Sequence, residues 1–220
     1  KEFLMISYLL FDLDGTLTNP KKGITKCVQY ALSFLGIQEP NLEKLVPFIG
    51  PPLLDSLQEF YHLSELQAHI AIQKYRERFR TIGLFENFPY PGIAQMLQTL
   101  QLQGKHLAVA SSKPTIFVKQ ILDKFELTPY FDVIEGSTLD GSRVKKEDVI
   151  AEVLRQFHNP PSNQHLMIGD RKFDILGAKQ MGFSCVGVRF GFAAPRELEE
   201  NGAIYIADSV NDLQEYLLKI

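Results

Sequence analysis

The chain has 220 residues, of which 45% are hydrophobic and 22% are charged, and its formal net charge is -3 at pH 7. This is the composition of a globular protein with room for one sizeable core, or for a core and a small second domain. The slight negative charge excludes the basic footprint of a protein that binds nucleic acid, and any site for an anion has to be positive locally.

The longest apolar runs, such as Tyr8–Phe11, are too short to cross a bilayer. Lys1–Ile6 does not resemble a signal peptide, because its charged start is followed directly by an expected strand and no small-residue cleavage site appears. Cys27 and Cys185 both lie in apolar patterns, which indicates small core residues rather than a disulfide or a reactive thiol. We therefore expect a cytoplasmic protein without a membrane partner, either a monomer or a weak homodimer.

The first expected element is a strand at Ile6–Phe11, an apolar run without alternation. Between about residues 20 and 87 the chain shows only helical patterns, at Ile24–Leu35, Leu53–Tyr61 and Glu65–Phe79. A block of helices inserted after the first strand indicates a separate sub-domain. Pro89, Pro91 and Gly92 would form its return linker.

From residue 92 to the end, helical patterns alternate with short apolar runs. Helices are expected at Ile93–Leu102, Pro114–Phe125, Asp148–Phe157 and Ile175–Met181. Strands are expected at Leu107–Ala110, Val133–Ile134, Leu166–Ile168, Cys185–Val188 and Ile204–Ile206. Most of these runs do not alternate, which is typical of strands buried on both faces of a parallel sheet. The sequence thus predicts an α/β fold, a doubly wound parallel sheet with an inserted all-helical domain.

Two carboxylates, Asp12 and Asp14, follow the first strand in the segment D-L-D-G-T at 12–16. The carboxyl end of a parallel strand is where α/β folds place ligands, and Gly15 lets the backbone turn away sharply. Neighbouring carboxylates repel each other, so a cation or a difference in protonation has to stabilise them. The alternative is an ordinary solvated Asp-Gly turn.

A second acidic pair, Asp170 and Asp174, follows the apolar run Leu166–Ile168. If a helix begins near Lys172, Asp170 lies in the loop at the strand end and Asp174 in the first helical turn. Asp170 would then bind a divalent ion, and Asp174 would orient its waters or fix a loop. Alternatively, both are only favourable charges at a helix N-terminus.

Ser111 and Ser112 end another expected strand, just before Lys113-Pro114. With a helix beginning at the proline, Ser111 and the backbone N–H groups can hydrogen-bond a phosphate oxygen. Alternatively, one of the serines is only the N-cap of that helix.

The lysine pair Lys145-Lys146 comes just before a helix expected to begin near Asp148. Such a pair is usually solvated, but next to a phosphate and an aspartyl nucleophile one lysine would neutralise developing charge.

These four motifs, taken together and in this order along the chain, resemble those of the haloacid dehalogenase superfamily of phosphatases. The resemblance covers D-L-D-G-T at 12–16, V-A-S-S-K at 109–113, the lysines at 145–146 and G-D-R-K-F-D at 169–174. The helical insertion resembles the C1 cap of that superfamily, which implies a Rossmann-like catalytic core of residues 1–18 and 88–220 and a cap of residues 19–87. Segments 23–26, 48–53 and 90–92 are similar to the phosphoglycolate phosphatase branch, especially to bacterial 5'-nucleotidase-like members.

The resemblance implies a magnesium-dependent phosphatase that hydrolyses a small phosphate monoester through an aspartyl-phosphate intermediate. Asp12 would be the nucleophile and Asp14 the general acid and base. Mg²⁺ would be held by Asp12, the Asp14 carbonyl, Asp170 and Asp174. The substrate phosphate would contact Gly15, Thr16, Ser111, Ser112 and Lys113. The family pattern K-x-D-V-I matches residues 146–150, which points to Lys146 rather than Lys145 as the catalytic lysine.

The expected partner is a small phosphorylated metabolite and not a nucleic acid polymer; a nucleoside monophosphate and phosphoglycolate both remain open. Candidate specificity residues in the cap are Lys22, Thr25, Lys26, Gly50 and Arg76. Two departures from the family pattern are Asn19-Pro20 after the first motif and Ser112 where many phosphoglycolate phosphatases have asparagine.

Other functions are compatible with the same motifs. A phosphomutase on the same scaffold and a non-catalytic phosphate-binding regulatory module are the alternatives to a phosphatase. A true dehalogenase is disfavoured, because that reaction does not require the acid and base that Asp14 supplies.

Overall fold

The protein is described by a computed structural model that covers residues 6–220. It forms two compact units. One contains the chain up to Thr18 together with Pro89–Ile220, and the other contains Asn19–Phe88. In residues 6–220 no helix combines the length and the apolar composition that a membrane crossing needs.

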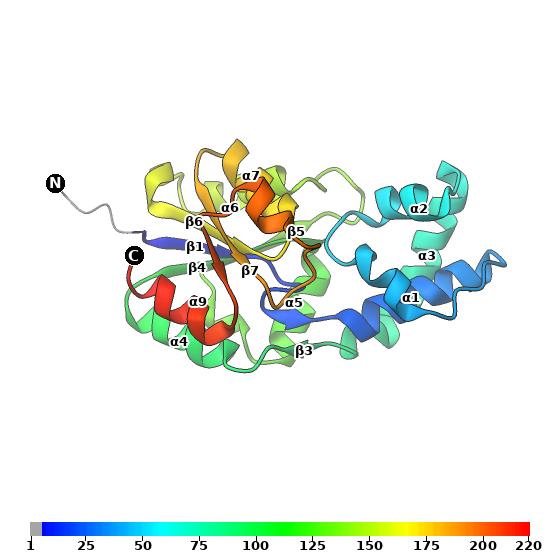
Figure 1. Ribbon diagram of the computed structural model, residues 1–220, viewed down its shortest axis with the longest axis horizontal. Helices are drawn as coiled ribbons and strands as arrows, with labels where there is room; N and C mark the ends of the chain where they lie inside the picture. Colours follow the sequence, from blue (N-terminus) through cyan, green and yellow to red (C-terminus); the bar gives the residue numbers. More distant parts are fainter. Residues whose placement is uncertain (1–5) are drawn as a thin grey trace. The chain divides into compact units, whose positions relative to one another are not determined.

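The first unit is built on a six-stranded sheet in the order β5-β4-β1-β6-β7-β8, and every pairing in it is parallel (Figure 1). The doubly wound parallel sheet expected from the sequence is thus confirmed. Its strands are β1 (Tyr8–Phe11), β4 (His106–Pro114), β5 (Val133–Ser137), β6 (His165–Gly169), β7 (Ser184–Val188) and β8 (Tyr205–Ala207). Because β1 pairs with both β4 and β6, the first strand of the chain lies at the centre of the sheet.

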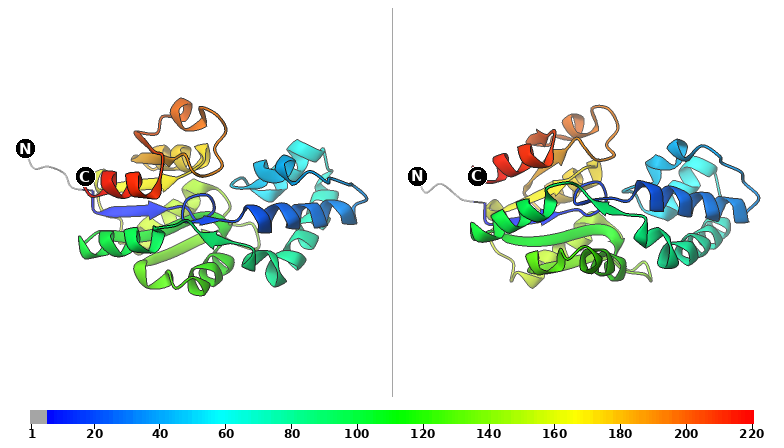
Figure 2. Two further views of the ribbon diagram at one scale, coloured as in Figure 1. Left: turned by 60° about the horizontal axis from the view of Figure 1, so that its bottom comes forward. Right: turned by 90° about the horizontal axis from the view of Figure 1, so that it is seen from below.

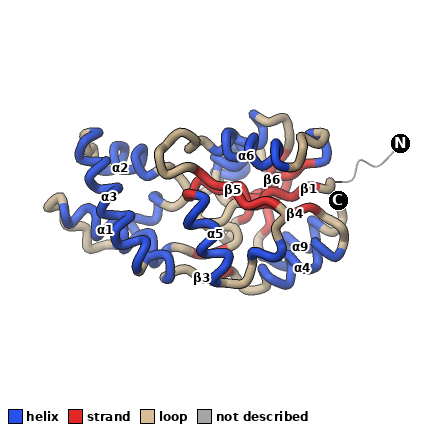
Figure 3. The backbone as a smooth tube through the Cα atoms, turned by 180° about the vertical axis from the view of Figure 1, so that it is seen from behind, coloured by secondary structure: helices blue, strands red, loops and turns tan. Residues whose placement is uncertain are grey.

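Helices cover both faces of this sheet, as the tube in Figure 3 also shows. On one face α6 (Lys146–Gln156) packs against α7 (Lys172–Gln180), and α7 packs against the short helix α8 (Glu197–Asn201). On the other face α4 (Ile93–Leu102) and α9 (Val210–Leu217) lie side by side (Figure 2). Helix α5 (Thr115–Lys124) packs against β4 and β5.

The core of this unit follows from the apolar pattern of its elements. Leu9, Leu10 and Phe11 in β1 are fully buried, as expected for a strand covered on both faces. In α4 the buried side chains are Ile93, Met96, Leu97 and Leu100, the spacing of a single helical stripe. Burial of these side chains fixes the sheet and therefore the positions of its strand ends.

The second unit is helical, with α1 (Lys21–Phe34), α2 (Leu53–Tyr61) and α3 (Glu65–Thr81) and two 3₁₀ segments, η1 (Leu42–Phe48) and η2 (Gly83–Phe85). Helices α1 and α3 pack against each other, and a capping box between Ser64 and Gln67 begins α3. The chain enters and leaves this unit through two short paired strands, β2 (Thr18–Asn19) and β3 (Phe88–Pro89).

Several boundaries differ from those expected. Strand β4 continues to Pro114 instead of ending at Ala110, and α6 begins at Lys146 instead of near Asp148. The helices α8 and α9 and the two 3₁₀ segments were not expected. A signal for α9 was present, since Ser209 accepts a hydrogen bond from the Asp212 N–H, a typical N-cap.

Candidate active site

The polar side chains of the site lie at or near the carboxyl ends of three neighbouring strands. Asp12 directly follows β1, and its N–H donates to the carbonyl of Ile168 in β6 at 2.9 Å. Asp170 directly follows β6, and Ser111 lies near the end of β4. Because β1 is paired in register with both neighbours, the three side chains are brought together by the sheet itself.

Lys146 connects two of the acidic residues. Its Nζ lies 3.0 Å from Asp12 Oδ1 and 2.8 Å from Asp174 Oδ1, and it donates to the Ala110 carbonyl at 3.0 Å. The lysine is buried, which by itself lowers its pKa, but the two carboxylates outweigh that effect and the pKa is raised. It is therefore a fixed positive charge beside Asp12.

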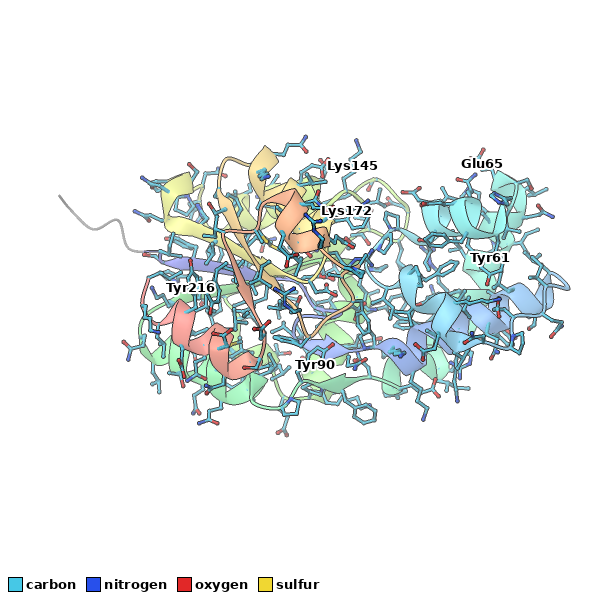
Figure 4. All side chains as sticks on the ribbon, in the orientation of Figure 1. Tyr61, Glu65, Tyr90, Lys145, Lys172 and Tyr216 are labelled. Atoms are coloured by element: carbon cyan, nitrogen blue, oxygen red, sulfur yellow. The ribbon has the colours of Figure 1, made fainter. Side chains whose placement is uncertain are left out.

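Lys145 is exposed and points outward (Figure 4). Of the two adjacent lysines, only Lys146 contacts Asp12.

The three carboxyl groups of Asp12, Asp170 and Asp174 offer oxygen atoms that lie within 4.8 Å of one another. Burial, together with the charges of Asp174 and Asp12, raises the pKa of Asp170 well above its ordinary value. Asp170 Oδ2 accepts a hydrogen bond from the Phe192 N–H at 2.7 Å, whereas Oδ1 is buried without a hydrogen-bond partner among the described residues. A buried, unpartnered carboxylate oxygen in an acidic cluster fits a hard divalent cation such as Mg²⁺.

Asp174 is part of the acidic cluster and also caps a helix, α7. It occupies the first turn of α7, where its Oδ2 accepts the Arg171 N–H at 3.1 Å and so caps the helix. The expectation that α7 begins near Lys172, with Asp170 in the loop and Asp174 in the first turn, is confirmed. The alternative, a favourable charge at a helix N-terminus, also applies to Asp174, whose carboxyl group caps the helix and belongs to the acidic cluster.

Asp14 points into the same site but has a different partner. Its carboxylate forms an ion pair with the Lys113 Nζ, and both side chains are largely buried. Burial raises the pKa of Asp14, although the Lys113 charge opposes this. Its other oxygen, Oδ1, has no hydrogen-bond partner among residues 6–220. Gly15, with φ of +88°, turns the chain immediately afterwards.

Three residues with hydroxyl groups were expected to bind phosphate, and two of them, Ser111 and Ser112, lie in β4. Ser111 is buried and its Oγ accepts the Lys113 N–H at 3.3 Å. Helix α5 has Pro114 as its N-cap and no side-chain cap bond, so the interpretation of Ser111 or Ser112 as an N-cap is wrong. Thr16 Oγ1 is buried without a hydrogen-bond partner in the described part of the chain, and Ser112 is half-buried.

Three further contributions were not expected from the sequence. The Phe192 N–H donates a hydrogen bond to the Asp170 carboxylate. The Glu197 carboxylate accepts the N–H groups of Lys172, shortly after Asp170, and of Ala194, shortly after Phe192. The Tyr90 hydroxyl is buried without a partner among the described residues, and burial together with the Asp170 and Asp14 charges raises its pKa. No residue type indicates a backbone donor, whereas Tyr90 enters the sequence analysis only within segment 90–92, which is similar to the phosphoglycolate phosphatase branch.

The candidate specificity residues lie in the helical unit. Thr25 is a poor candidate, because it is buried and its hydroxyl donates to the Lys21 carbonyl at 2.7 Å within α1. Lys26 lies 3.7 Å from Glu86. Gly50 has φ of +107° and lies two residues ahead of Pro52, the N-cap of α2, so it forms a turn before that helix.

This fold and site define a class of protein, a parallel α/β protein in which buried carboxyl groups and one buried lysine gather at the carboxyl ends of the strands. Residues 9–188 match the family of haloacid dehalogenase-like hydrolases. The chain belongs to this family.

Two curated relatives and one solved structure extend the comparison. A 5'-nucleotidase of Pseudomonas aeruginosa is 44% identical over 95% of this chain and 94% of its own length. A tyrosine-protein kinase, PtkA, of Mycobacterium tuberculosis is 34% identical over 95% of this chain and 72% of its own length. The crystal structure of a predicted phosphatase from Clostridium acetobutylicum has a TM-score of 0.95 and 46% identity, covering 98% of this chain and 100% of that one. The family, the 5'-nucleotidase and the Clostridium acetobutylicum structure identify the chain as a phosphoric monoester hydrolase.

Proposed function

We propose that the protein hydrolyses a nucleoside 5'-monophosphate through an aspartyl-phosphate intermediate on Asp12, with Mg²⁺ as cofactor. The observation that carries the chemistry is the buried Lys146, whose Nζ lies 3.0 Å from Asp12 Oδ1. The substrate class is supported by the relative named 5'-nucleotidase, which matches nearly the full length of both chains. Phosphoglycolate is the alternative substrate.

In the first half-reaction an Asp12 oxygen attacks phosphorus and the bond from phosphorus to the leaving oxygen breaks. Asp14 gives its proton to that oxygen, a role favoured by burial, which raises its pKa. Lys146 and Ser111 would hold the oxygens of the transferred group, and Lys113 would pair with phosphate when a substrate is bound. Bound Mg²⁺ would neutralise charge on the phosphoryl oxygens.

In the second half-reaction Asp14, now a carboxylate, takes a proton from a water molecule that attacks the phosphorus of the intermediate. The bond between phosphorus and the Asp12 oxygen breaks, which releases inorganic phosphate and restores both aspartates. Asp12, the Asp14 carbonyl, Asp170 and Asp174 would hold the cation. We further propose that the helical unit acts as a cap domain that sets the choice of substrate.

The test combines a panel of phosphate esters with an isosteric variant. Wild type should release inorganic phosphate from nucleoside monophosphates, lose this activity in excess chelator and regain it with Mg²⁺. Asp12→Asn should fold normally and lose turnover, because an amide is scarcely nucleophilic. Release of phosphate separates hydrolysis from transfer to a second acceptor, which a phosphomutase or a kinase requires. Substantial turnover by a folded, non-deamidated Asp12→Asn protein would contradict the mechanism.

A further inference from the structure

Glu197 is an acidic residue outside the catalytic cluster that is almost fully buried, with 9% of its surface exposed. It begins helix α8, and its Oε1 accepts hydrogen bonds from the Lys172 N–H at 2.7 Å and from Arg171 Nε at 3.0 Å. Its Oε2 accepts the Ala194 N–H at 2.9 Å. Burial raises the pKa of Glu197, but these donors outweigh it and the pKa is lowered, so the carboxylate is charged.

The two segments that Glu197 joins both border Asp170. Arg171 and Lys172 follow Asp170 in the chain and begin α7, and Lys172 lies beside α8 (Figure 4). The other segment, which we call the β7–α8 loop (residues 189–196), runs from the end of β7 to the start of α8. One carboxylate thus ties the start of α7 to a loop that is distant from it in sequence.

The β7–α8 loop lies directly against the Asp170 side chain. The Phe192 N–H donates to Asp170 Oδ2 at 2.7 Å. At Gly191 an added Cβ would lie 2.3 Å from Asp170 Cβ and 2.6 Å from the Gly15 carbonyl oxygen, so only glycine fits there. This close approach depends on the position of the loop backbone, and the Glu197 bond to the Ala194 N–H is two residues from the donor.

The consequence for Asp170 is that its two oxygens have different roles. Oδ2 is held by the loop, whereas Oδ1 is the buried oxygen without a partner among the described residues. If the loop moved away, the carboxyl group would lose the bond that fixes its rotation. A carboxylate that rotates freely loses part of its affinity for a cation, because ordering it then costs entropy at the moment of binding.

We propose that Glu197 is a positioning residue, which holds the β7–α8 loop against α7 so that Asp170 presents Oδ1 to a divalent cation. The inference rests on the proposed function only in its use of the cation. A merely structural role for Glu197, as a cap of α7 and an anchor of α8, would change the stability of the protein and leave its metal affinity alone.

The experiment measures Mg²⁺ binding to the whole protein without substrate, by calorimetry and by the Mg²⁺-dependent rise in melting temperature. Glu197→Ala should raise the Mg²⁺ dissociation constant roughly 10–100-fold, the usual cost of losing a residue that supports a metal ligand. Glu197→Gln keeps one acceptor oxygen and should fall between this variant and wild type. At saturating Mg²⁺ the KM for substrate should stay close to that of wild type, while the Mg²⁺ concentration for half-maximal activity rises with the dissociation constant.

The matched control is Glu200→Ala in the same helix, where an exposed glutamate lies 3.4 Å from Arg196. It should bind Mg²⁺ as wild type does. If Glu197→Ala does not fold, Glu197→Gln decides the question by the same measurement. A folded Glu197 variant with lower melting temperature and wild-type Mg²⁺ affinity would overturn the proposal. Wild type that binds no Mg²⁺ would overturn the metal assignment and this inference together, whereas a different preferred substrate would affect only the proposed function.

Discussion

Lys146 shows how closely residue chemistry depends on a single position in the chain. It contacts Asp12, Asp174 and a backbone carbonyl, while its neighbour Lys145 is exposed. Removing Lys146 leaves the charge of Asp12 and of the incoming phosphate uncompensated in a buried site.

We therefore expect Lys146→Ala to lower kcat/KM at least roughly a hundredfold, comparable to the loss of an oxyanion donor. Lys145→Ala should change kcat/KM by no more than a few-fold, as for other exposed charges. Steady-state kinetics of both variants, with circular dichroism to check folding, makes the comparison. A severe defect in Lys145→Ala beside a nearly normal Lys146→Ala would reverse the assignment.

His165 is a second buried residue with a testable titration, and it lies at the opposite end of its strand from Asp170. It begins β6, and its ring packs near Tyr8 and Phe183 at centroid distances of 5.1 and 5.4 Å. Burial lowers its pKa, although nearby backbone groups of Ser162 and Pro161 oppose this. The folded protein therefore holds this histidine neutral at a pH where the unfolded chain already binds a proton.

The sign of the effect on stability follows from linkage. Below the unfolded pKa of about 6.5, the unfolded state takes up a proton that the folded state does not, so His165 makes stability fall as pH decreases. His165→Gln should flatten the decline in the free energy of unfolding between roughly pH 7 and 5, by at most one proton. Urea denaturation across this range measures it, with the exposed His69→Gln as control. Identical slopes for wild type and His165→Gln would contradict the expectation.

The residues at strand ends could be predicted because their chemistry is visible in the sequence. Asp12, Asp14 and Asp170 each follow an apolar run, and parallel pairing brings the ends of such runs together. Glu197 could not be predicted in this way. Its carboxylate binds backbone N–H groups, and the partners of a backbone group depend on the tertiary fold and not on residue type.

At the scale of elements, the predicted helices and strands are largely those of the structure, since both follow apolar periodicity. Helix α4 and helix α2 have the expected bounds. The start of α6 was missed because its N-cap, Lys145, makes no side-chain cap bond, so the usual capping residue is absent. The long course of β4 was missed because its last residues lack the apolar pattern, and its register with β5 shifts between Ser111 and Pro114.

The packing of α6 on α7 places Lys146 within reach of Asp12. At Gly177 in α7 an added Cβ would lie 2.8 Å from Lys146 Cγ, so the lysine stem lies directly against the α7 backbone. This contact joins residues that are distant in the chain, and no local pattern indicates it. The lysine is recognisable from its motif, whereas the glycine that accommodates it is recognisable only in the fold.

At the scale of the whole molecule, the acidic cluster proposed to hold a cation lowers the stability of the fold. Asp12, Asp170 and Asp174 lie close together in a buried cluster, and Asp170 Oδ1 lacks a partner among residues 6–220. Repulsion between buried carboxylates and an unmet hydrogen-bonding group both destabilise the metal-free fold. Such costs are typical of functional sites.

Asp170→Asn should therefore raise the melting temperature of the metal-free protein, by about 2–4 °C if the gain is about 1 kcal/mol. Mg²⁺ should raise the melting temperature of wild type, because it binds only the folded state, and should have little effect on the variant. Differential scanning calorimetry in chelator and in Mg²⁺ tests both parts. An Asp170→Asn protein that is less stable than wild type in chelator would show that Asp170 serves the fold instead.

The central place of β1 in the sheet has a consequence for how the protein folds during its synthesis on the ribosome. Its buried segment Leu9-Leu10-Phe11 is made well before its partner strands, which begin only at His106 and His165. At roughly 5–20 residues per second, synthesis of the chain between β1 and β4 takes roughly 5–20 s. The helices of residues 19–88 have mostly local contacts and can form in that interval. The strand that precedes Asp12 cannot pair in that interval, so the nascent chain carries an apolar, unpaired segment until translation brings its neighbours.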